Sequence, residues 1–422
     1  MSSLLSMAKT RSLVALFFLL PVVSICQQRE LSYFVDTSLR INPQLFENKN
    51  LISSNSIDSQ IIVATNKIQV TGVSNSYYAP VIGGFGYDAA ITNGQQLNAM
   101  VSVTKQVYNK RNLAVQFENL QLQNDSLKIA SAITIQDIKK GVVSQYVITY
   151  GDQLEIDFTN ELIDLLSHEE GVLKTLTQKN VYKQADYLSF LVTLQQQELN
   201  LRQLVVQYKN DYATLNYLSG ITDTTTSFRL SDPDLHYVGD FEYDTSIFFK
   251  KFLVDSLQLI NQRTGVAVSY RPKVSLYGDG GYLSSLVLTP YKNFGTSFGI
   301  NLSIPIYDGH QRQLQYSKIN ILERTREKKR DYFSQQLTQQ IRQLQQQLRE
   351  LENLKAPIDK QIDYLRALID VNGKLLETGD VKITDYVLAL NNYIMSRNLV
   401  VQNAIARYQV INQLNYWNAS GY

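Results

Sequence analysis

Two interleaved seven-residue repeats in the second half of the sequence restrict the fold more than any other feature. Their members are all leucine or isoleucine, at Leu337, Leu344, Leu351, Ile358 and Leu365 in one series and at Ile341, Leu348, Ile362, Ile369 and Leu376 in the other. This is the a/d pattern of coiled-coil packing. A helix over residues 310–378 would be about 100 Å long at 1.5 Å per residue, and Pro357 would remove one of its hydrogen bonds and favour a kink. A compact domain cannot hold such a helix, so we expect an elongated molecule.

The sequence also repeats itself at a spacing of 199 residues. The recurring groups are Val107-Tyr108 with Ile306-Tyr307, Lys183-x-x-Asp186-Tyr187 with Lys382-x-x-Asp385-Tyr386, and Leu215-Asn216-Tyr217 with Leu414-Asn415-Tyr416. Three matches at one spacing indicate an internal duplication. A fourth pair, Tyr78-x-Pro80 and Tyr270-x-Pro272, is spaced by 192 residues and predicts a seven-residue insertion in the second half. We infer a first repeat at 27–220, a connector at 221–243 and a second repeat at 244–422.

Each repeat contains a predicted strand pair. Residues 294–306 alternate between apolar even positions and an odd face of Gly295, Ser297, Gly299, Asn301 and Ser303, and residues 97–107 alternate in the same way. Period-2 alternation is typical of a strand with one apolar face. Partner strands are expected at 73–85 and 274–282.

Strands of about ten residues with flanking aromatic residues fit a membrane barrel better than a soluble sandwich. A sheet that spans a membrane must have no open edge. Four strands cannot close a barrel, so several copies of the chain would have to contribute to it.

A long helix and a shorter returning helix follow each strand pair. The expected ranges are 109–178 and 184–218 in the first repeat, and 310–378 and 383–417 in the second. The first long helix has a less regular apolar pattern, and Gly141, Gly151 and Gly171 weaken it.

The N-terminus has the features of an export signal. Lys9 and Arg11 precede the apolar run 13–23, which is followed by Ser24-Ile25-Cys26. This order predicts a signal peptide at 1–26, because the run is much shorter than the ~20 residues that span a bilayer as a helix. Acylation of Cys26 in a lipoprotein is the alternative, and the bulky Ile25 favours cleavage after Cys26 instead.

Charge and cysteine content exclude several functions. The chain has 40 basic and 38 acidic residues, and residues 1–26 hold two of the basic residues and the single cysteine. A mature chain of zero net charge is a poor nucleic-acid binder, and without cysteine it cannot form a disulfide or a thiolate metal site. The sequence contains no G-x-S-x-G motif and no phosphate-binding glycine loop, and its three histidines are scattered. We therefore expect no enzymatic activity, no cofactor and no metal.

Three segments resemble a known family. They are the strand-to-helix passage 302–312 (LSIPIYDGHQR), the turn between helices at 377–390 (ETGDVKITDYVLAL) and Asn42-Pro43. With the duplicated order of strands and helices, they make residues 31–420 similar to the TolC-like outer-membrane efflux proteins. The resemblance implies a homotrimer with a 12-stranded outer-membrane barrel, four strands from each chain. An α-helical coiled-coil tunnel would continue the barrel into the periplasm of a Gram-negative bacterium.

The resemblance also implies a function. Such a protein is the passive exit duct of a tripartite efflux or type I secretion system. Its partners are a periplasmic adaptor protein, an inner-membrane pump of the ABC, RND or MFS type, and outer-membrane lipid. No nucleic acid is expected. The alternative class is a secreted periplasmic coiled-coil adaptor, which would carry one helical hairpin beside a compact β-rich domain.

Two sets of site residues follow from the resemblance. A periplasmic gate is expected at the helical turns, and its residues would be Lys183, Asp186, Tyr187, Gly379, Asp380, Lys382, Asp385 and Tyr386. A junction between barrel and tunnel is expected at Tyr108, Tyr307, Asp308 and Gly309.

Several of these gate residues also have an ordinary structural explanation. Asp186 and Asp385 could line the pore as acidic rings or simply cap the returning helices. Lys382 lies within helical reach of Asp385 and could neutralise part of its field. For Tyr187 and Tyr386, plain packing at the turn is the favoured interpretation. Gly379 is explained most simply as a helix terminator.

Overall fold

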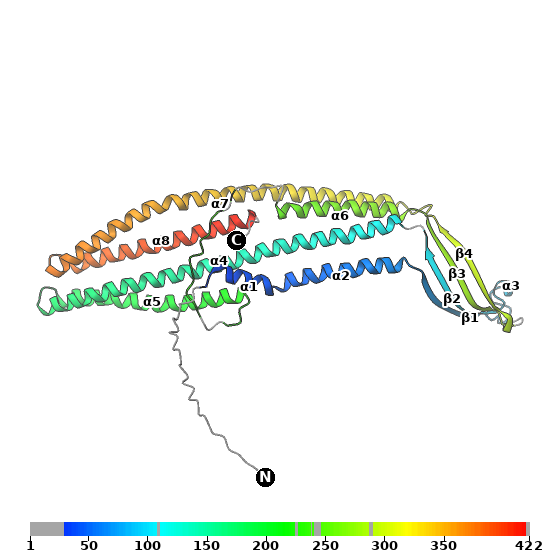
Figure 1. The fold of residues 1–422 in the computed structure, drawn as a ribbon, viewed down its shortest axis with the longest axis horizontal. Coiled ribbons are helices and arrows are strands. Elements are labelled where there is room, and N and C mark those ends of the chain that lie inside the picture. The colour runs from blue at the N-terminus through cyan, green and yellow to red at the C-terminus, as the bar shows by residue number, and fades with distance from the viewer. Residues whose placement is uncertain are drawn as a thin grey trace, which may run out of the picture.

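The computed structural model describes residues 29–107, 110–223, 227–237, 239, 246–286 and 290–418. The predicted signal peptide, Tyr108 and part of the predicted connector lie outside these residues. The molecule is elongated, as expected, with a sheet at one end and paired helical turns at the other (Figure 1). None of the helices within the described ranges is sufficiently long and apolar to span a membrane.

Four antiparallel strands form a single sheet in the order β1-β2-β3-β4. The strands are β1 Gln69–Tyr78, β2 Gln95–Gln106, β3 Lys273–Ser284 and β4 Phe294–Ser303. The short helix α3 Ala89–Thr92 lies between β1 and β2, and a 3₁₀ turn at Pro290–Lys292 precedes β4. Strand β1 begins four residues before its predicted start and ends well before Phe85, because residues 79–94 form a loop around α3.

The register gives the sheet one apolar and one polar face. Directly paired residues share a face, so the pairs Tyr282–Phe294 and Leu276–Ile300 place apolar side chains on one side. The apolar face is largely exposed in the single chain: Phe298 is 87 % exposed. The predicted odd face of β4 lies on the opposite, polar side, which also carries Ser275 and Asp279 of β3.

The strand register corrects one sequence match. Gln69 pairs with Thr104 in the first hairpin, and Lys273 pairs with Ser303 in the second. Thr104 and Ser303 are 199 residues apart, so the equivalent of Gln69 is Lys273 and the spacing of β1 and β3 is 204. The match of Tyr78 with Tyr270 was therefore wrong, because Tyr270 precedes β3 and the second hairpin loop is shorter than the first.

The predicted helices are confirmed nearly to the residue. They are α4 Lys110–Gln178, α5 Gln184–Leu218, α7 Gln311–Thr378 and α8 Ile383–Asn418. Helix α7 runs through Pro357 without a break and curves along its length (Figure 1). The heptad residues form its buried side: Leu337, Ile341, Leu344, Leu348, Ile358, Ile362, Ile369 and Leu376.

Helix α4 also continues through its three glycines. Gly151 lies where α4 packs against α8, and a Cβ there would come within 2.2 Å of the Ile405 Cδ1. A glycine that looked unfavourable for the helix thus allows two helices to approach closely.

Three further helices were not predicted. They are α1 Leu31–Ile41, α2 Pro43–Thr65 and α6 Ile247–Ser269. The polar residues of α2 are scattered around the helix, so it shows no single apolar stripe. The sequence Asn42-Pro43 does mark the start of α2: Pro43 is its first residue, and the Asn42 Oδ1 accepts hydrogen bonds from the amides of Gln44 and Leu45. Asparagine at the N-cap followed by proline is a helix start.

Helix α4 is the centre of the packing. It contacts α2 and α6 on the side of the sheet, and α5 and α8 toward the turns. Its middle contributes Val143 and Tyr146 to one buried cluster, together with Phe34 of α1. Its distal end contributes Leu166 and Leu173 to a second cluster beside the turns.

Candidate functional site

The two helical turns that the sequence assigns to a gate end in the same backbone motif. Asn180 follows α4 with φ of 62°, and Gly379 follows α7 with φ of 81°. The amide of Val181 donates to the Leu176 carbonyl at 2.9 Å, and that of Asp380 donates to the Leu375 carbonyl at 2.9 Å. Each helix therefore ends in a left-handed residue with a 6→1 hydrogen bond. Asn180 and Gly379 are 199 residues apart, so the two halves end their long helices at equivalent positions.

The two turns are in direct contact with each other. The Tyr182 hydroxyl in the first turn lies 3.1 Å from the Leu376 carbonyl and 3.0 Å from the Val381 carbonyl, and donates to this pair. Val181 packs closely on Gly379: a Cβ added to Gly379 would lie 2.6 Å from the Cγ1 of Val181. Burial, and then the nearby charge of Asp380, raise the pKa of the Tyr182 phenol. Sequence reasoning missed Tyr182, although it lies within the predicted gate segment.

The two acids of the predicted gate, Asp186 and Asp385, lie inside the first turns of their helices and not at the N-cap. Asp186 lies in the first turn of α5, whose N-cap is Lys183, and this cap makes no side-chain hydrogen bond. Asp385 occupies the equivalent place in α8 and is exposed. Among the described residues, Lys382 and Asp385 form no ion pair. A groove of about 230 Å³ between the starts of α5 and α8 is lined by Asp186, Ser189, Ile383, Thr384, Val387, Leu388 and Asn391.

Tyr187 and Tyr386 occupy equivalent sequence positions but different environments. Tyr386 is fully buried and stacks on Phe190, with ring centroids 6.4 Å apart. Burial is also the main cause of its raised pKa, followed by the charge of Glu169. The Tyr187 hydroxyl instead donates to Glu170 of α4. This hydrogen bond raises the pKa of the Tyr187 phenol. Both tyrosines thus pack at the turn.

Two of the predicted junction residues, Asp308 and Gly309, shape the start of α7. Gly309 and His310 both have positive φ, at 62° and 66°. The Asp308 carboxylate accepts from the Arg312 amide at 2.8 Å and so satisfies a donor at the helix N-terminus. A hydrogen bond from Tyr270, at the end of α6, is the main cause that lowers the pKa of Asp308. Tyr307 is exposed.

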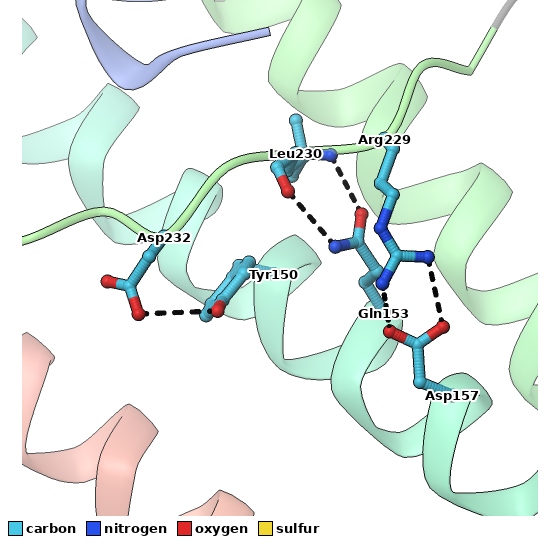
Figure 2. Close-up of polar contacts among 6 residues, drawn as sticks. All are labelled: Tyr150, Gln153, Asp157, Arg229, Leu230 and Asp232. Atoms are coloured by element: carbon cyan, nitrogen blue, oxygen red, sulfur yellow. Dashed lines mark hydrogen bonds and ion pairs between the residues drawn. The ribbon is translucent and has the colours of Figure 1, made fainter. Parts of the chain in front are cut away.

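A strap across the middle of the helices was not predicted as such. Residues 227–237 cross α4 and α8, and Leu230 pairs with Arg29 in an isolated parallel bridge. The Gln153 side chain of α4 bonds both backbone groups of Leu230: its Nε2 donates to the carbonyl at 3.0 Å and its Oε1 accepts from the amide at 2.8 Å (Figure 2). Asp157 accepts two hydrogen bonds from Arg229. The sequence marked this stretch only as a connector.

Two carboxyl groups face each other close to the strap. Asp152 of α4 is 5 % exposed and lies against Asp211 of α5. Gln207 donates to Asp152 at 3.0 Å, and Gln145 donates to Asp211 at 3.1 Å. Burial, then the hydrogen bond and the charge of Asp211, raise the pKa of Asp152 to about 7. Glu155, one turn away, also has a pKa raised by burial.

The chain is similar to known proteins in its structure, but not in its sequence. No protein-family profile matches the sequence, and no curated protein matches it by sequence. Among solved structures, the chain is similar to the outer membrane protein VceC from Vibrio cholerae, at 10 % identity and a TM-score of 0.73, covering 93 % of this chain and 96 % of that chain.

Two channel proteins show the same similarity. CusC is 11 % identical with a TM-score of 0.77, and 93 % of each chain is covered. The open-state MtrE outer membrane channel of Neisseria gonorrhoeae is 11 % identical with a TM-score of 0.68, covering 93 % and 89 % of the two chains. The chain therefore has the fold of the TolC-like outer-membrane channels.

Proposed function

We propose that three copies of this chain form an exit duct through the outer membrane of a Gram-negative bacterium. The observation that carries the proposal is a four-stranded sheet with two open edges, β1 and β4, and an exposed apolar face. Open edges are not tolerated in a bilayer. Pairing β4 of one copy with β1 of the next removes every edge, and three copies give a 12-stranded barrel.

An exposed heptad stripe on α5 supports packing between copies. Val192, Leu199 and Val206 follow each other at intervals of seven residues and are 68 %, 55 % and 59 % exposed. An apolar series of this period is a coiled-coil seam that needs a partner helix. A second copy supplies that partner, and the assembled helices of about 100 Å then surround a tunnel.

The duct conducts passively and catalyses no reaction. Similarity in fold to CusC and to the MtrE outer membrane channel supports this assignment. Energy would come from an inner-membrane pump of the ABC, RND or MFS type, which a periplasmic adaptor connects to the helical turns. Small toxic molecules or secreted polypeptides are the cargo of such a system.

We place the gate of this duct at the contacting turns. Its residues are Lys183, Asp186, Tyr187, Gly379, Asp380, Lys382, Asp385 and Tyr386, to which Tyr182 is added. Tyr182 supports the assignment because its hydroxyl joins one turn to the other. Separation of the turns would break this contact.

Reconstitution tests the duct directly. The full chain, purified in detergent and added to a planar bilayer, is expected to give stepwise ion conductance. A protein that remains soluble and monomeric without detergent, and that leaves the bilayer resistance unchanged, would contradict the proposal. That outcome would favour the secreted adaptor, which needs no apolar sheet face.

A further inference from the structure

A large basic cavity lies where the sheet meets the helices. It has a volume of about 750 Å³ and is bounded by the ends of β2, β3, β4 and α6 and by the start of α4. Its cationic members are Lys110, Arg111, Arg271 and Lys273. None of the described residues that line the cavity is acidic.

The strand register assigns the cavity to the polar face of the sheet. Lys273 pairs with Ser303, and Ser275 pairs with Asn301. Gln106 of β2 pairs with the same Ser275. All five residues therefore share the polar face. In a closed barrel this face surrounds the water-filled interior. Lys273, and the cavity that it shares with Lys110, Arg111 and Arg271, would therefore open to the duct at the periplasmic end of its barrel.

The cations of the cavity are not compensated by carboxylates. The described part of the chain has no ion pair that involves any of the four. Asp308 does not line the cavity, and its hydrogen bonds are with Tyr270 and the amide of Arg312. Like charges gathered in one concave site repel each other unless an anion binds between them, and low-dielectric walls focus their field on that anion.

We propose that this cavity is an anion-binding site that selects small organic anions bearing phosphate, carboxylate or sulfonate groups as they pass through the duct. The proposal rests on the proposed function, because only barrel closure turns the cavity toward the conducted solution. Rings of Arg and Lys select anions and phosphates in pores. Arg271 and Arg111 can each bind a phosphate oxygen pair with a planar fork, whereas the lysines act as point charges. A cavity of this volume lies in the range that holds a drug-sized ligand.

Block of the ion current by inorganic tripolyphosphate tests the site. The full chain is placed in a bilayer of phosphatidylcholine, so that no anionic lipid headgroup competes, and tripolyphosphate is added to either side. We expect concentration-dependent block, weakened at least about tenfold when Lys110, Arg111, Arg271 and Lys273 are all changed to Gln. A repeat in bilayers that contain phosphatidylglycerol separates the two sources of phosphate, because lipid headgroups that filled the site would weaken the block.

Two single variants provide a matched comparison. Lys273→Gln removes a cation from the polar face, and Lys105→Gln removes one from the apolar face at the same end of the sheet, since Lys105 pairs with Leu276. Only Lys273→Gln is expected to weaken the block by tripolyphosphate. If the quadruple variant does not assemble, the comparison of these two single variants tests the anion site. Current without block, or equal block in both variants, would overturn the anion site and leave the duct intact. Absence of any current would overturn the duct as well.

Discussion

At the scale of single residues, the hydroxyl of Tyr182 is the clearest link between the two turns. Replacing it by phenylalanine keeps the ring and removes the donor to Leu376 and Val381. The loss of one such hydrogen bond costs about 0.5–1.5 kcal/mol. We expect faster hydrogen exchange at the amide of Asp380, which closes the second turn on Leu375.

The control for Tyr182→Phe is Tyr332→Phe. Tyr332 is 62 % exposed on α7 and its hydroxyl contacts only Gln336 among the polar contacts described. This variant should leave exchange at the turns unchanged. If exchange at Asp380 were equally slow in the wild type and in Tyr182→Phe, the hydroxyl would not hold the turns together.

A second residue-scale prediction concerns pH. Burial, and then the neighbouring Asp211, raise the pKa of Asp152 in the folded chain from its ordinary value of 3.8 to about 7. Between about pH 4 and pH 7 the folded state therefore holds a proton that the unfolded state releases. The contribution of this group to the free energy of unfolding is complete below about pH 4 and is lost as the pH rises toward 7. Asp152→Asn keeps an acceptor for Gln207 and removes the repulsion with Asp211.

Calorimetry at pH 5 and pH 8 measures this effect. The melting temperature of the wild type should fall more between these two values than that of Asp152→Asn, in which the α4–α5 interface no longer gains a charge. The control is Asp164→Asn, an exposed acid on the same helix. Identical pH dependence in the wild type and in Asp152→Asn would show that the pair of carboxyl groups does not titrate in this range.

At the scale of elements, the strap depends on one glutamine. Gln153 bonds both the amide and the carbonyl of Leu230 and is itself buried. Gln153→Ala leaves two backbone groups of a buried residue without partners, at about 1–3 kcal/mol for each. We expect the Leu230 amide to exchange much faster in this variant, while amides of α7 are unaffected.

An exposed glutamine on the same helix gives the comparison for the strap. Gln178→Ala, at the end of α4, should not change exchange at Leu230. Continued protection of the Leu230 amide in Gln153→Ala would mean that the parallel bridge to Arg29 holds the strap without the side chain.

Element by element, the sequence was informative where a single period dominates. The heptads of α7 predicted that helix and its buried side, and the alternation of β4 predicted that strand and its apolar face. Both predictions succeeded because one side of each element is uniformly apolar. Helix α2 was missed because its polar residues are spread around the helix, although Asn42-Pro43 marked its start. Tyr182 and Gln153 could not be found from the sequence, since their roles depend on backbone groups 194 and 77 residues away. The strand register was needed to show that Tyr78 and Tyr270 are not equivalent.

At the scale of the whole molecule, the single chain leaves two sheet edges, an apolar sheet face and an apolar stripe on α5 exposed. The edges of β1 and β4, the apolar face with Phe298, and the α5 stripe at Val192, Leu199 and Val206 all need partners. The proposed trimer would cover the edges and the stripe at once, because copies arranged around a three-fold axis would bring β4 to β1 and one helix pair to the next. The apolar face would then be the surface that contacts lipid.

Single-particle electron microscopy of the protein purified in detergent tests this claim most directly. The account predicts three-fold particles longer than ~100 Å, with a short barrel at one end and a tapering helical tunnel at the other. Thin monomers, or particles of another symmetry, would contradict it, because four strands from each chain would then not close a 12-stranded barrel.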